Sequence, residues 1–399
     1  MMFNKALGDI TVLDVSDHIP GAYCTKLLGG FGAEVIKVEK PGEGDSSRKI
    51  GPFPGNQSHP EKSALFLYLN TRKKGITLNL NCKTGRNIFK QLVMEADVLV
   101  ENFQPGEMSN MGLDFVSLEK IQPKLVMVSI TPFGQTGPYR NYKASSITSY
   151  AMGGQMYVSG QPDREPLFCS SSQPEYVAGL YGFVGTMAAL HARRQTGKGQ
   201  HLDISVMECM ASSHQFTLTW PEYSGTLLKR PGWPGSVYPM NVYRCKDGYI
   251  VLRIAGIEIG FLSELLNNPD LNDDPRFQTD EKRLEHLTEL DAIVAEGIAH
   301  LHKKDIFLSA GAWRELSGYV ATPQDLLNDP HYRDRGFWAD IDHPYTGTLT
   351  YPGAPFKMTK TPWIMDRAPL LGEHNKEFYG DKLGYNHEEL VRLRESGVI

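Results

Sequence analysis

The chain lacks the features that would mark a secreted, membrane-bound or nucleic-acid-binding protein. Its five cysteines among 399 residues are odd in number and scattered, and they form neither a CxxC pair nor a disulfide framework. The longest uncharged apolar stretch, residues 176–190, is too short to span a bilayer, and the N-terminus has no apolar signal-peptide core. A formal charge of −5 without a long basic run argues against nucleic acid or an anionic membrane as partner. We therefore expect a cytoplasmic protein that binds neither.

The order of apolar and polar segments predicts an α/β fold. Hydrophobic residues make up 41% of the chain and charged residues 22%, which is typical of a globular protein. Strand-like and helix-like segments alternate over the first 130 residues, and this pattern predicts a parallel sheet with helices on both faces. The expected strands are Ile10–Val15, Glu34–Glu39, Ile76–Leu80, Asp97–Glu101 and Leu125–Thr131.

The rest of the chain divides into a glycine-spaced helix, a linker and two further segments. Residues 176–194 are expected to be helical although Gly179, Gly182 and Gly185 cross them, so we expect close backbone packing there. The clearest linker is the sequence PGWPG at 231–235. Beyond it we expect a strand at 249–254, a largely helical region at 258–316 and a final segment at 330–399 that ends in a short charged helix.

Generic catalytic motifs are missing from the sequence. It contains no Walker A loop, no GxSxG elbow and no zinc-ligand spacing, so we expect no metal. One basic cluster could hold phosphates, although isolated solvated charges would explain any single member; its members are Lys37, Lys40, Arg48, Arg72, Lys73 and Lys74. These patterns alone indicate an α/β protein that could bind an anionic ligand.

Several phrases in collinear order are more specific. They are GAEVIKVE at 32–39, GDSSR at 44–48, ENF at 101–103, FGQTGPY at 133–139, TGKGQ at 196–200 and LGEHN at 371–375. Together they resemble the family III CoA-transferases, the formyl-CoA transferase and carnitine CoA-transferase type, over nearly the whole chain. The resemblance implies a large Rossmann-like domain built from residues 1–224 and 330–399, a smaller domain at 225–329, and an interlocked dimer of two threaded subunits.

The ligand implied by this resemblance is coenzyme A or an acyl-CoA. Because the thioester would be a substrate, no cofactor is expected. The candidate CoA-binding residues, by position in the family pattern, are Lys40, Leu78, Asn102, Phe103 and Lys143. For Leu78 and Phe103, ordinary core packing is an equally good explanation.

The same resemblance implies a catalytic carboxylate. Family members use an aspartate that attacks the donor thioester to give a mixed anhydride, which CoA thiolate converts into an enzyme thioester. Counting back from the sequence AAL at 188–190, that position here is Glu175. Its extra methylene displaces the carboxylate, and a shift of about 1 Å can lower a rate on the order of a hundredfold. A glutamate in the first turn of a helix is also an ordinary favourable charge.

Three more positions depart from the family pattern. Ser146 replaces an acidic residue of many relatives, Asn110 replaces an expected arginine, and PGA at 20–22 replaces an Ala-Gly-Pro turn. The departures favour a non-catalytic subunit whose paralogous partner bears the aspartate, as in succinyl-CoA:(R)-benzylsuccinate CoA-transferase of anaerobic toluene degradation. That analogy suggests succinyl-CoA as donor and (R)-benzylsuccinate as acceptor. Two alternatives stay open: a self-sufficient CoA-transferase that uses Glu175, and a CoA-binding regulatory protein without turnover.

Overall fold

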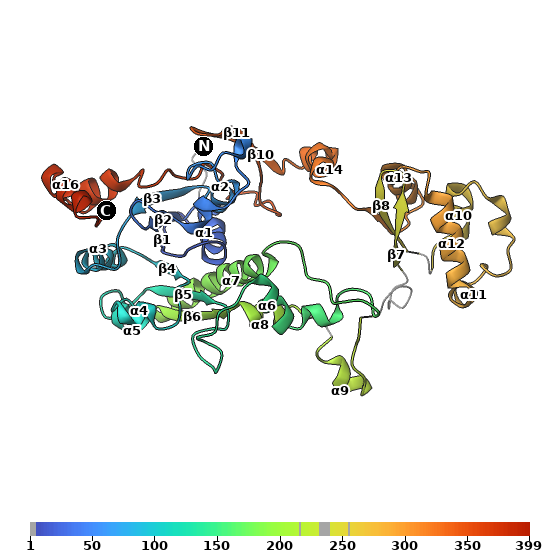
Figure 1. Cartoon of the computed structure of the whole chain (residues 1–399), viewed down its shortest axis with the longest axis horizontal. Coiled ribbons are helices and arrows are strands. Elements are labelled where there is room, and N and C mark those ends of the chain that lie inside the picture. Colours follow the sequence, from blue (N-terminus) through green and yellow to red (C-terminus); the bar gives the residue numbers. More distant parts are fainter. Residues whose placement is uncertain (1–4, 215–216, 231–239, 254–255) are drawn as a thin grey trace. The chain divides into compact units, whose positions relative to one another are not determined.

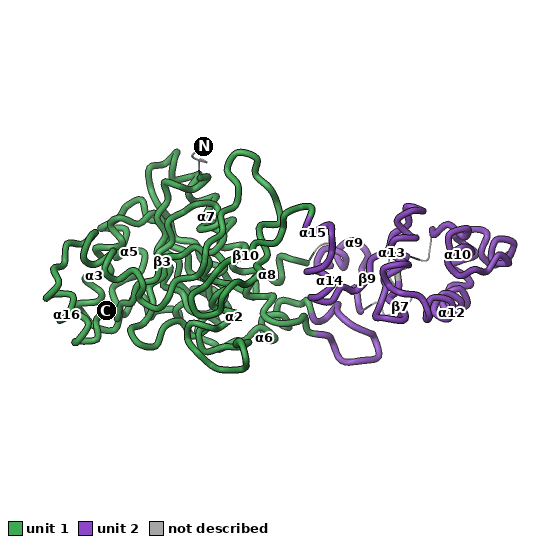
Figure 2. The backbone as a smooth tube through the Cα atoms, turned by 90° about the horizontal axis from the view of Figure 1, so that it is seen from above, with its two compact units in different colours: residues 1–155, 168–216, 334–399 green, residues 156–167, 217–333 purple. Residues whose placement is uncertain are grey.

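The computed structural model describes residues 5–214, 217–230, 240–253 and 256–399 (Figure 1). These residues form two compact units (Figure 2). The first unit comprises residues 1–155, 168–216 and 334–399, and the second comprises residues 156–167 and 217–333. The expected linker at 231–235 lies outside the described residues.

The first unit is built on a six-stranded parallel sheet, which confirms the expected α/β fold. The strand order is β3-β2-β1-β4-β5-β6, the order of a doubly wound Rossmann sheet. The strands are β1 (Thr11–Asp14), β2 (Glu34–Glu39), β3 (Lys73–Thr77), β4 (Val98–Glu101), β5 (Val126–Thr131) and β6 (Gln200–Ser205). The order reverses between β1 and β4, and ligands of such sheets bind at the carboxyl ends of the strands at this reversal.

The third strand begins earlier than the sequence pattern predicted. The expected strand was Ile76–Leu80, whereas β3 spans Lys73–Thr77. Lys73 is buried in the strand because its ammonium group binds the Asp14 carboxylate at 2.9 Å. A charged residue that is neutralised in this way does not show in a hydrophobicity pattern.

Helices cover both faces of the sheet. Adjacent strand residues such as Val12 and Leu13 are both fully buried, because their side chains enter cores on opposite faces. One core is formed with α1 (Pro20–Gly30) and α7 (Gln173–Thr196), and the other includes α3 (Lys83–Met94) and residues preceding and following α16 (His387–Glu395). Shorter helices of this unit are α2 (Ala64–Leu69), α4 (Glu107–Asn110), α5 (Phe115–Glu119), α6 (Ser146–Met152) and α8 (Val206–Ser212).

The glycines of α7 allow the close packing that the sequence suggested. A Cβ atom at Gly179 would lie 2.6 Å from the carbonyl oxygen of Pro20, at the start of α1. A Cβ at Gly185 would lie 2.7 Å from a methyl carbon of Leu202 in β6. Both distances are far below van der Waals contact, so the expectation of close backbone packing is confirmed.

The second unit combines a small antiparallel sheet with helices. The sheet contains β7 (Met240–Cys245), β8 (Gly248–Arg253) and β9 (Ser317–Tyr319) in that order. The helices are α9 (Trp220–Ser224), α10 (Ile259–Leu265), α11 (Asp280–Glu285), α12 (Leu287–Ile298), α13 (Lys303–Ala312) and α14 (Pro323–Asn328), and α15 (Pro330–Asp334) lies at the boundary. The predicted strand at 249–254 is confirmed up to Arg253, because residue 254 lies outside the described residues, and the largely helical region after it is confirmed.

The C-terminal segment returns to the first unit. It forms the hairpin of β10 (Trp338–His343) and β11 (Gly347–Pro352) and ends in α16, which is the short charged helix that the sequence predicted. Asn386 and Glu389 form a capping box at its start. Within the described residues, none of the helices combines the length and the apolar character that a membrane span requires.

Candidate functional site

A cavity of about 500 Å³ lies at the carboxyl ends of β1 to β4. The loops that follow these four strands form its walls, so it occupies the point where the strand order reverses. Four of the five predicted CoA-binding residues contribute to the lining: Lys40, Leu78, Asn102 and Phe103. The fifth, Lys143, is exposed in the segment before α6 and does not line this cavity.

The side chain of Asn102 joins two walls of the cavity. Its Oδ1 accepts the Asp17 backbone N–H at 2.8 Å, and its Nδ2 donates to the Asp17 carbonyl at 2.7 Å. The loops after β1 and β4 are therefore tied together across the reversal. The contacts show Asn102 as a residue that shapes the cavity, with one amide hydrogen left over.

Leu78 and Phe103 belong to both the core and the cavity. Leu78 is 2% exposed and packs in the core between the sheet and α3, and Phe103 packs against the edge of the same core while half-buried. Both residues line the cavity as well. Core packing is therefore observed for both residues, and their contact with CoA stays a prediction.

A buried carboxyl group, Glu101, holds the backbone of the β4 loop. It accepts the N–H of Phe103 at 2.7 Å. Burial raises its pKa to about 7, and the nearby carboxylates of Asp203 and Glu107 act in the same direction, while hydrogen bonds from Ser129 and Phe103 oppose the rise. Sequence analysis did not identify this residue as functional, although it opens the ENF phrase.

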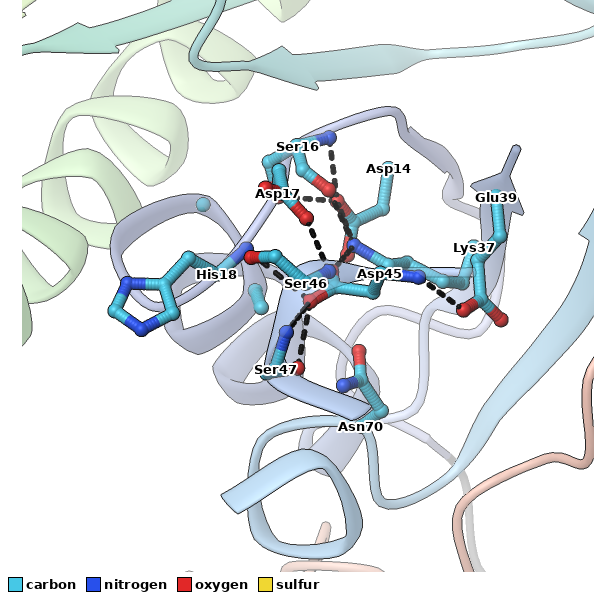
Figure 3. A network of polar contacts seen from close by, with 12 residues as sticks. Asp14, Ser16, Asp17, His18, Lys37, Glu39, Asp45, Ser46, Ser47 and Asn70 are labelled. Carbon is cyan, nitrogen blue, oxygen red and sulfur yellow. Dashed lines mark hydrogen bonds and ion pairs between the residues drawn. The ribbon is translucent and has the colours of Figure 1, made fainter. Parts of the chain in front are cut away.

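Asp45 organises the loop after β2 (Figure 3). Its Oδ1 accepts hydrogen bonds from the backbone N–H and hydroxyl of Ser47, at 2.8 and 2.6 Å, and from the N–H of His18 at 3.2 Å. Its Oδ2 lies 2.7 Å from the ammonium group of Lys37. Burial alone would raise the pKa of Asp45, but the charge of Lys37 and these hydrogen bonds hold it below its usual range.

The expectation that the basic cluster holds phosphates is wrong for three of its members, Lys37, Arg48 and Lys73. Lys73 and Lys37 face the buried Asp14 carboxylate at 2.9 and 3.6 Å, and both are almost fully buried. Arg48 is buried too, where it binds Glu39 through two hydrogen bonds of 2.7 and 2.8 Å. These cations neutralise carboxylates inside the unit, because an unpaired buried carboxylate would be strongly destabilising.

Lys40 is the exposed member of that cluster that lines the cavity, where it pairs with Glu43 at 2.6 Å. Lys49 and His18 also line the cavity, and sequence analysis missed both. Lys49 follows the GDSSR phrase directly, which is a signal that could have identified it. His18 has a left-handed backbone with φ of 65°, which no sequence pattern indicates.

Glu175 lies in the first turn of α7 and is half-buried. The hydroxyl of Ser146, the first residue of α6, donates toward both of its carboxylate oxygens at 2.7 Å. The carboxylate therefore lies where the starts of two helices meet, and backbone dipoles at helix starts favour negative charge. The serine and glutamate that depart from the family pattern are in direct contact.

Packing connects the start of α7 to the start of α1. Tyr176, next to Glu175, makes an edge-to-face contact with Tyr23 of α1 at 5.0 Å between ring centroids. Helix α1 begins two residues after His18, which lines the cavity. Glu175 is thus near the cavity loops without lining the cavity itself.

Another departure from the family pattern, Asn110, lies beside the cavity. Asn110 is exposed at the end of α4, next to Met111, which lines the cavity. A neutral amide replaces the guanidinium expected there, so one fixed positive charge is missing from this wall. Among the described residues, no three His, Cys, Asp or Glu side chains gather as metal ligands.

The doubly wound sheet has a cavity at its strand-order reversal, which is where α/β proteins of this class bind their ligands. Residues 7–375 match the model of CoA-transferase family III. The chain belongs to this family and is a CoA-transferase.

Curated relatives and a solved structure agree with this assignment. The chain is 32% identical to the succinyl-CoA–D-citramalate CoA-transferase of Chloroflexus aurantiacus, over 99% of this chain and 98% of that protein. It is also 32% identical to the succinyl-CoA–L-malate CoA-transferase beta subunit of the same organism, over 98% of each. The crystal structure of a CAIB/BAIF family protein from Brucella suis matches with a TM-score of 0.86 and 30% identity, over 95% of this chain and all of that one.

Proposed function

We propose that this CoA-transferase moves CoA from succinyl-CoA to a second carboxylic acid and that Glu175 is its acyl-accepting carboxylate. The observation that carries the proposal is the contact between Glu175 and Ser146, because the hydroxyl orients a carboxylate at the family's catalytic position. The donor is suggested by the two relatives whose names contain succinyl-CoA. Their acceptors, citramalate and malate, suggest a small dicarboxylic acid as acceptor.

The exchange needs only carboxylates and a thiolate. The Glu175 carboxylate attacks the thioester carbonyl and the C–S bond breaks. CoA departs as the thiolate, and a mixed anhydride of succinate and Glu175 remains on the enzyme. The thiolate then attacks the glutamyl carbonyl, succinate leaves, and Glu175 carries CoA as a thioester. The acceptor carboxylate attacks this thioester and releases the thiolate, which attacks the acceptor's acyl carbon and frees Glu175.

The cavity at the strand ends suits the CoA part of the substrate. Lys40 and Lys49 would face its phosphates, and the apolar surfaces of Leu78 and Phe103 would take less polar parts. CoA enters and leaves as a substrate, so no cofactor is needed. We extend the proposal to the interlocked dimer that the family resemblance implies.

A second candidate is a non-catalytic subunit beside a paralogue that supplies an aspartate. Asn110 and Ser146 favour it, because each removes a charge from the family pattern. A relative named as a beta subunit shows that similar chains occur with a partner chain. In this arrangement the paralogous subunit performs the exchange.

The acceptor acid of either arrangement could be aromatic, and (R)-benzylsuccinate stays a candidate. Tyr150 and Phe168 form an edge-to-face pair at 5.5 Å. Cys169 follows Phe168, and burial together with the nearby Glu175 carboxylate raises the pKa of its thiol. The aromatic pair is therefore close to the carboxylate that would carry the acyl group.

The test is exchange of radiolabelled succinate into succinyl-CoA by the purified chain alone. Exchange by the chain that is lost in Glu175→Gln supports the proposal, and mass spectrometry should then find CoA on the peptide containing Glu175. Exchange that persists in Glu175→Gln overturns it. Exchange only after addition of the paralogous chain favours the second candidate. If the chain exchanges none of succinate, oxalate, malate, citramalate or (R)-benzylsuccinate, alone or with the paralogous chain, the result favours the remaining alternative, a CoA-binding protein without turnover.

A further inference from the structure

A second cavity of about 580 Å³ lies at the other end of the sheet, where β1 and β2 begin. Its walls come from residues 5–11, the turn before β2, the start of β3 and the C-terminal segment 366–374. It shares no lining residue with the cavity at the carboxyl ends. Its volume is within the range of small-molecule sites in proteins, about 300 to 1,000 Å³.

Arg72, which lines this cavity, is half-buried and has an unpartnered nitrogen in its guanidinium group. Its Nε is buried and has no hydrogen-bond partner among the described residues, and its side chain forms no ion pair with any carboxylate in that part of the chain. By contrast, the buried guanidinium of Arg48 binds Glu39 and Glu61. A buried N–H donor without an acceptor is unfavourable, so an anion that accepts from Nε is the natural complement of Arg72.

The backbone holds Arg72 in an unusual conformation. Its φ of 62° lies in the left-handed region, which is uncommon for residues other than glycine. Its N–H donates to the carbonyl oxygens of Asp366 and Arg367, each at 3.1 Å, and so fixes the residue between the sheet and the C-terminal segment. Strain of this kind is found where a side chain must be held for a ligand.

The neighbouring cations differ from Arg72 because they are already neutralised. Lys74 binds Glu34 and Glu377 at 2.9 and 2.6 Å, and Arg367 binds Glu373 through both of its terminal nitrogens. Among the residues that the structure describes, Lys5 and Arg72 are the exposed or half-buried cations of the lining for which no ion pair is found.

Three further groups of the lining bear on what could bind. His374 accepts the N–H of Gly75 at its Nδ1, so its neutral form carries a donor proton on Nε2. Asp366 accepts the N–H of Arg367 at 2.7 Å, and Asp9 is exposed. His374 therefore offers a donor in the same lining as Arg72, and both carboxylates remain able to accept from a hydroxyl group of a ligand.

We propose that Arg72 is the centre of a binding site for a small oxyanion, a carboxylate or a phosphate, that is separate from the CoA cavity. The planar guanidinium of an arginine forms two parallel hydrogen bonds with such groups. His374 and Lys5 complete the donor set. The site would take a free small molecule, because the cavity lies away from the strand ends that face the first cavity.

The test is calorimetric titration of the full chain with inorganic phosphate and, separately, acetate, at an ionic strength fixed with NaCl. Arg72→Asn is the main variant, because asparagine tolerates a left-handed backbone better than most residues. We expect binding at least tenfold weaker in Arg72→Asn. The matched control, Arg140→Asn at an exposed arginine, should bind within twofold of the parent. Lys40→Gln reports whether the anion binds in the CoA cavity instead.

Three results would overturn the proposal: no binding by the parent chain, equal binding by Arg72→Asn, or a loss of binding in Lys40→Gln alone. Phosphate binding without acetate binding would identify a phosphate site, and binding of both would identify a general oxyanion site. A second variant, Arg72→Lys, keeps the charge and removes the planar fork, and we expect a threefold to tenfold loss. If Arg72→Asn does not fold, parent-like affinity in Arg72→Lys contradicts the proposed geometry.

Discussion

The hydroxyl of Ser146 donates toward both carboxylate oxygens of Glu175, at 2.7 Å each. The family resemblance places an acidic residue at the first position and an aspartate at the second. In this chain the longer glutamate meets a neutral donor, so two negative charges do not face each other. The two departures therefore fit each other: Ser146 supplies a neutral donor where a second carboxylate would repel Glu175. This arrangement is what a functional carboxylate at position 175 would need.

Replacing Ser146 with alanine should lower kcat for CoA exchange. A hydrogen bond to a charged group contributes about 1.5 to 3 kcal/mol, which corresponds to roughly a tenfold to hundredfold change in rate. The measurement compares kcat and KM for succinyl-CoA in the active assembly. Ser146→Thr keeps the hydroxyl and should retain most of the rate. Parent-like kcat in Ser146→Ala would show that the hydroxyl does not act on the reacting carboxylate.

Replacing Arg48 with methionine should strongly destabilise the first unit. Arg48 neutralises the buried Glu39 and also binds Glu61 at 2.7 Å. Removing one partner of a buried pair reduces the free energy of unfolding by about 3 to 5 kcal/mol. Lys40→Met is the matched control, because the side chains of Lys40 and Glu43 are 52% and 55% exposed and such pairs contribute less than about 1 kcal/mol. Urea denaturation of both variants checks this, and equal midpoints would contradict it.

The sequence identified the parts of the fold and site that follow from local patterns. The β5 strand is buried along its whole length, so its apolar run was visible. Lys40 directly follows the GAEVIKVE phrase, which ends with β2, and Asn102 belongs to the ENF phrase at the end of β4; both line one cavity. Parallel strands place their carboxyl ends at one edge, and residues that follow different strands therefore meet there.

Other features depend on pairings between residues far apart in the chain. Lys73 is a buried strand residue because of Asp14, which is 59 positions away. The amide of Asn102 is occupied by the backbone of Asp17, 85 positions away, and Ser146 meets Glu175 across 29 positions. Hydrophobic periodicity describes neighbours along one element, so it cannot reveal these contacts. The phosphate-binding interpretation of Lys73 was wrong for this reason.

Glu101 should make stability fall as pH rises toward neutrality. Its pKa is raised to about 7 in the folded chain from an ordinary value of 4.5, so the folded state binds its proton more tightly than the unfolded state. The stabilisation is complete below pH 4.5 and is lost as pH rises through 7. The change is on the order of 3 kcal/mol, because each pKa unit is worth about 1.4 kcal/mol.

The measurement for Glu101 is urea denaturation at several values between pH 5 and 8. Glu101→Gln cannot titrate and keeps an oxygen that can accept the N–H of Phe103. This variant should lose the descending component of the parent's curve. Identical pH dependence in the two proteins would show that the Glu101 carboxyl group does not titrate in this range.

The glycine at the contact between α7 and α1 gives the last prediction. Alanine is a better helix former than glycine by about 1 kcal/mol, so Gly179→Ala would stabilise an isolated helix. In this chain its methyl group would lie 2.6 Å from the carbonyl oxygen of Pro20, a backbone atom that cannot rotate away. Overpacking of this kind reduces the free energy of unfolding by about 1 to 3 kcal/mol. We therefore expect Gly179→Ala to unfold at lower urea concentration than the parent.

The control for this prediction is Gly311→Ala in α13. A Cβ at Gly311 meets no atom within 4 Å, so the variant gains helix propensity without a clash. It should stabilise the second unit by up to about 1 kcal/mol. Opposite shifts of the two variants would show that backbone contact, and not propensity, selects glycine in α7.

Because Glu175 lies one turn before Gly179, Gly179→Ala should also reduce CoA exchange if the start of α7 must lie against α1. Full exchange by a destabilised Gly179→Ala would show that this helix contact serves stability alone.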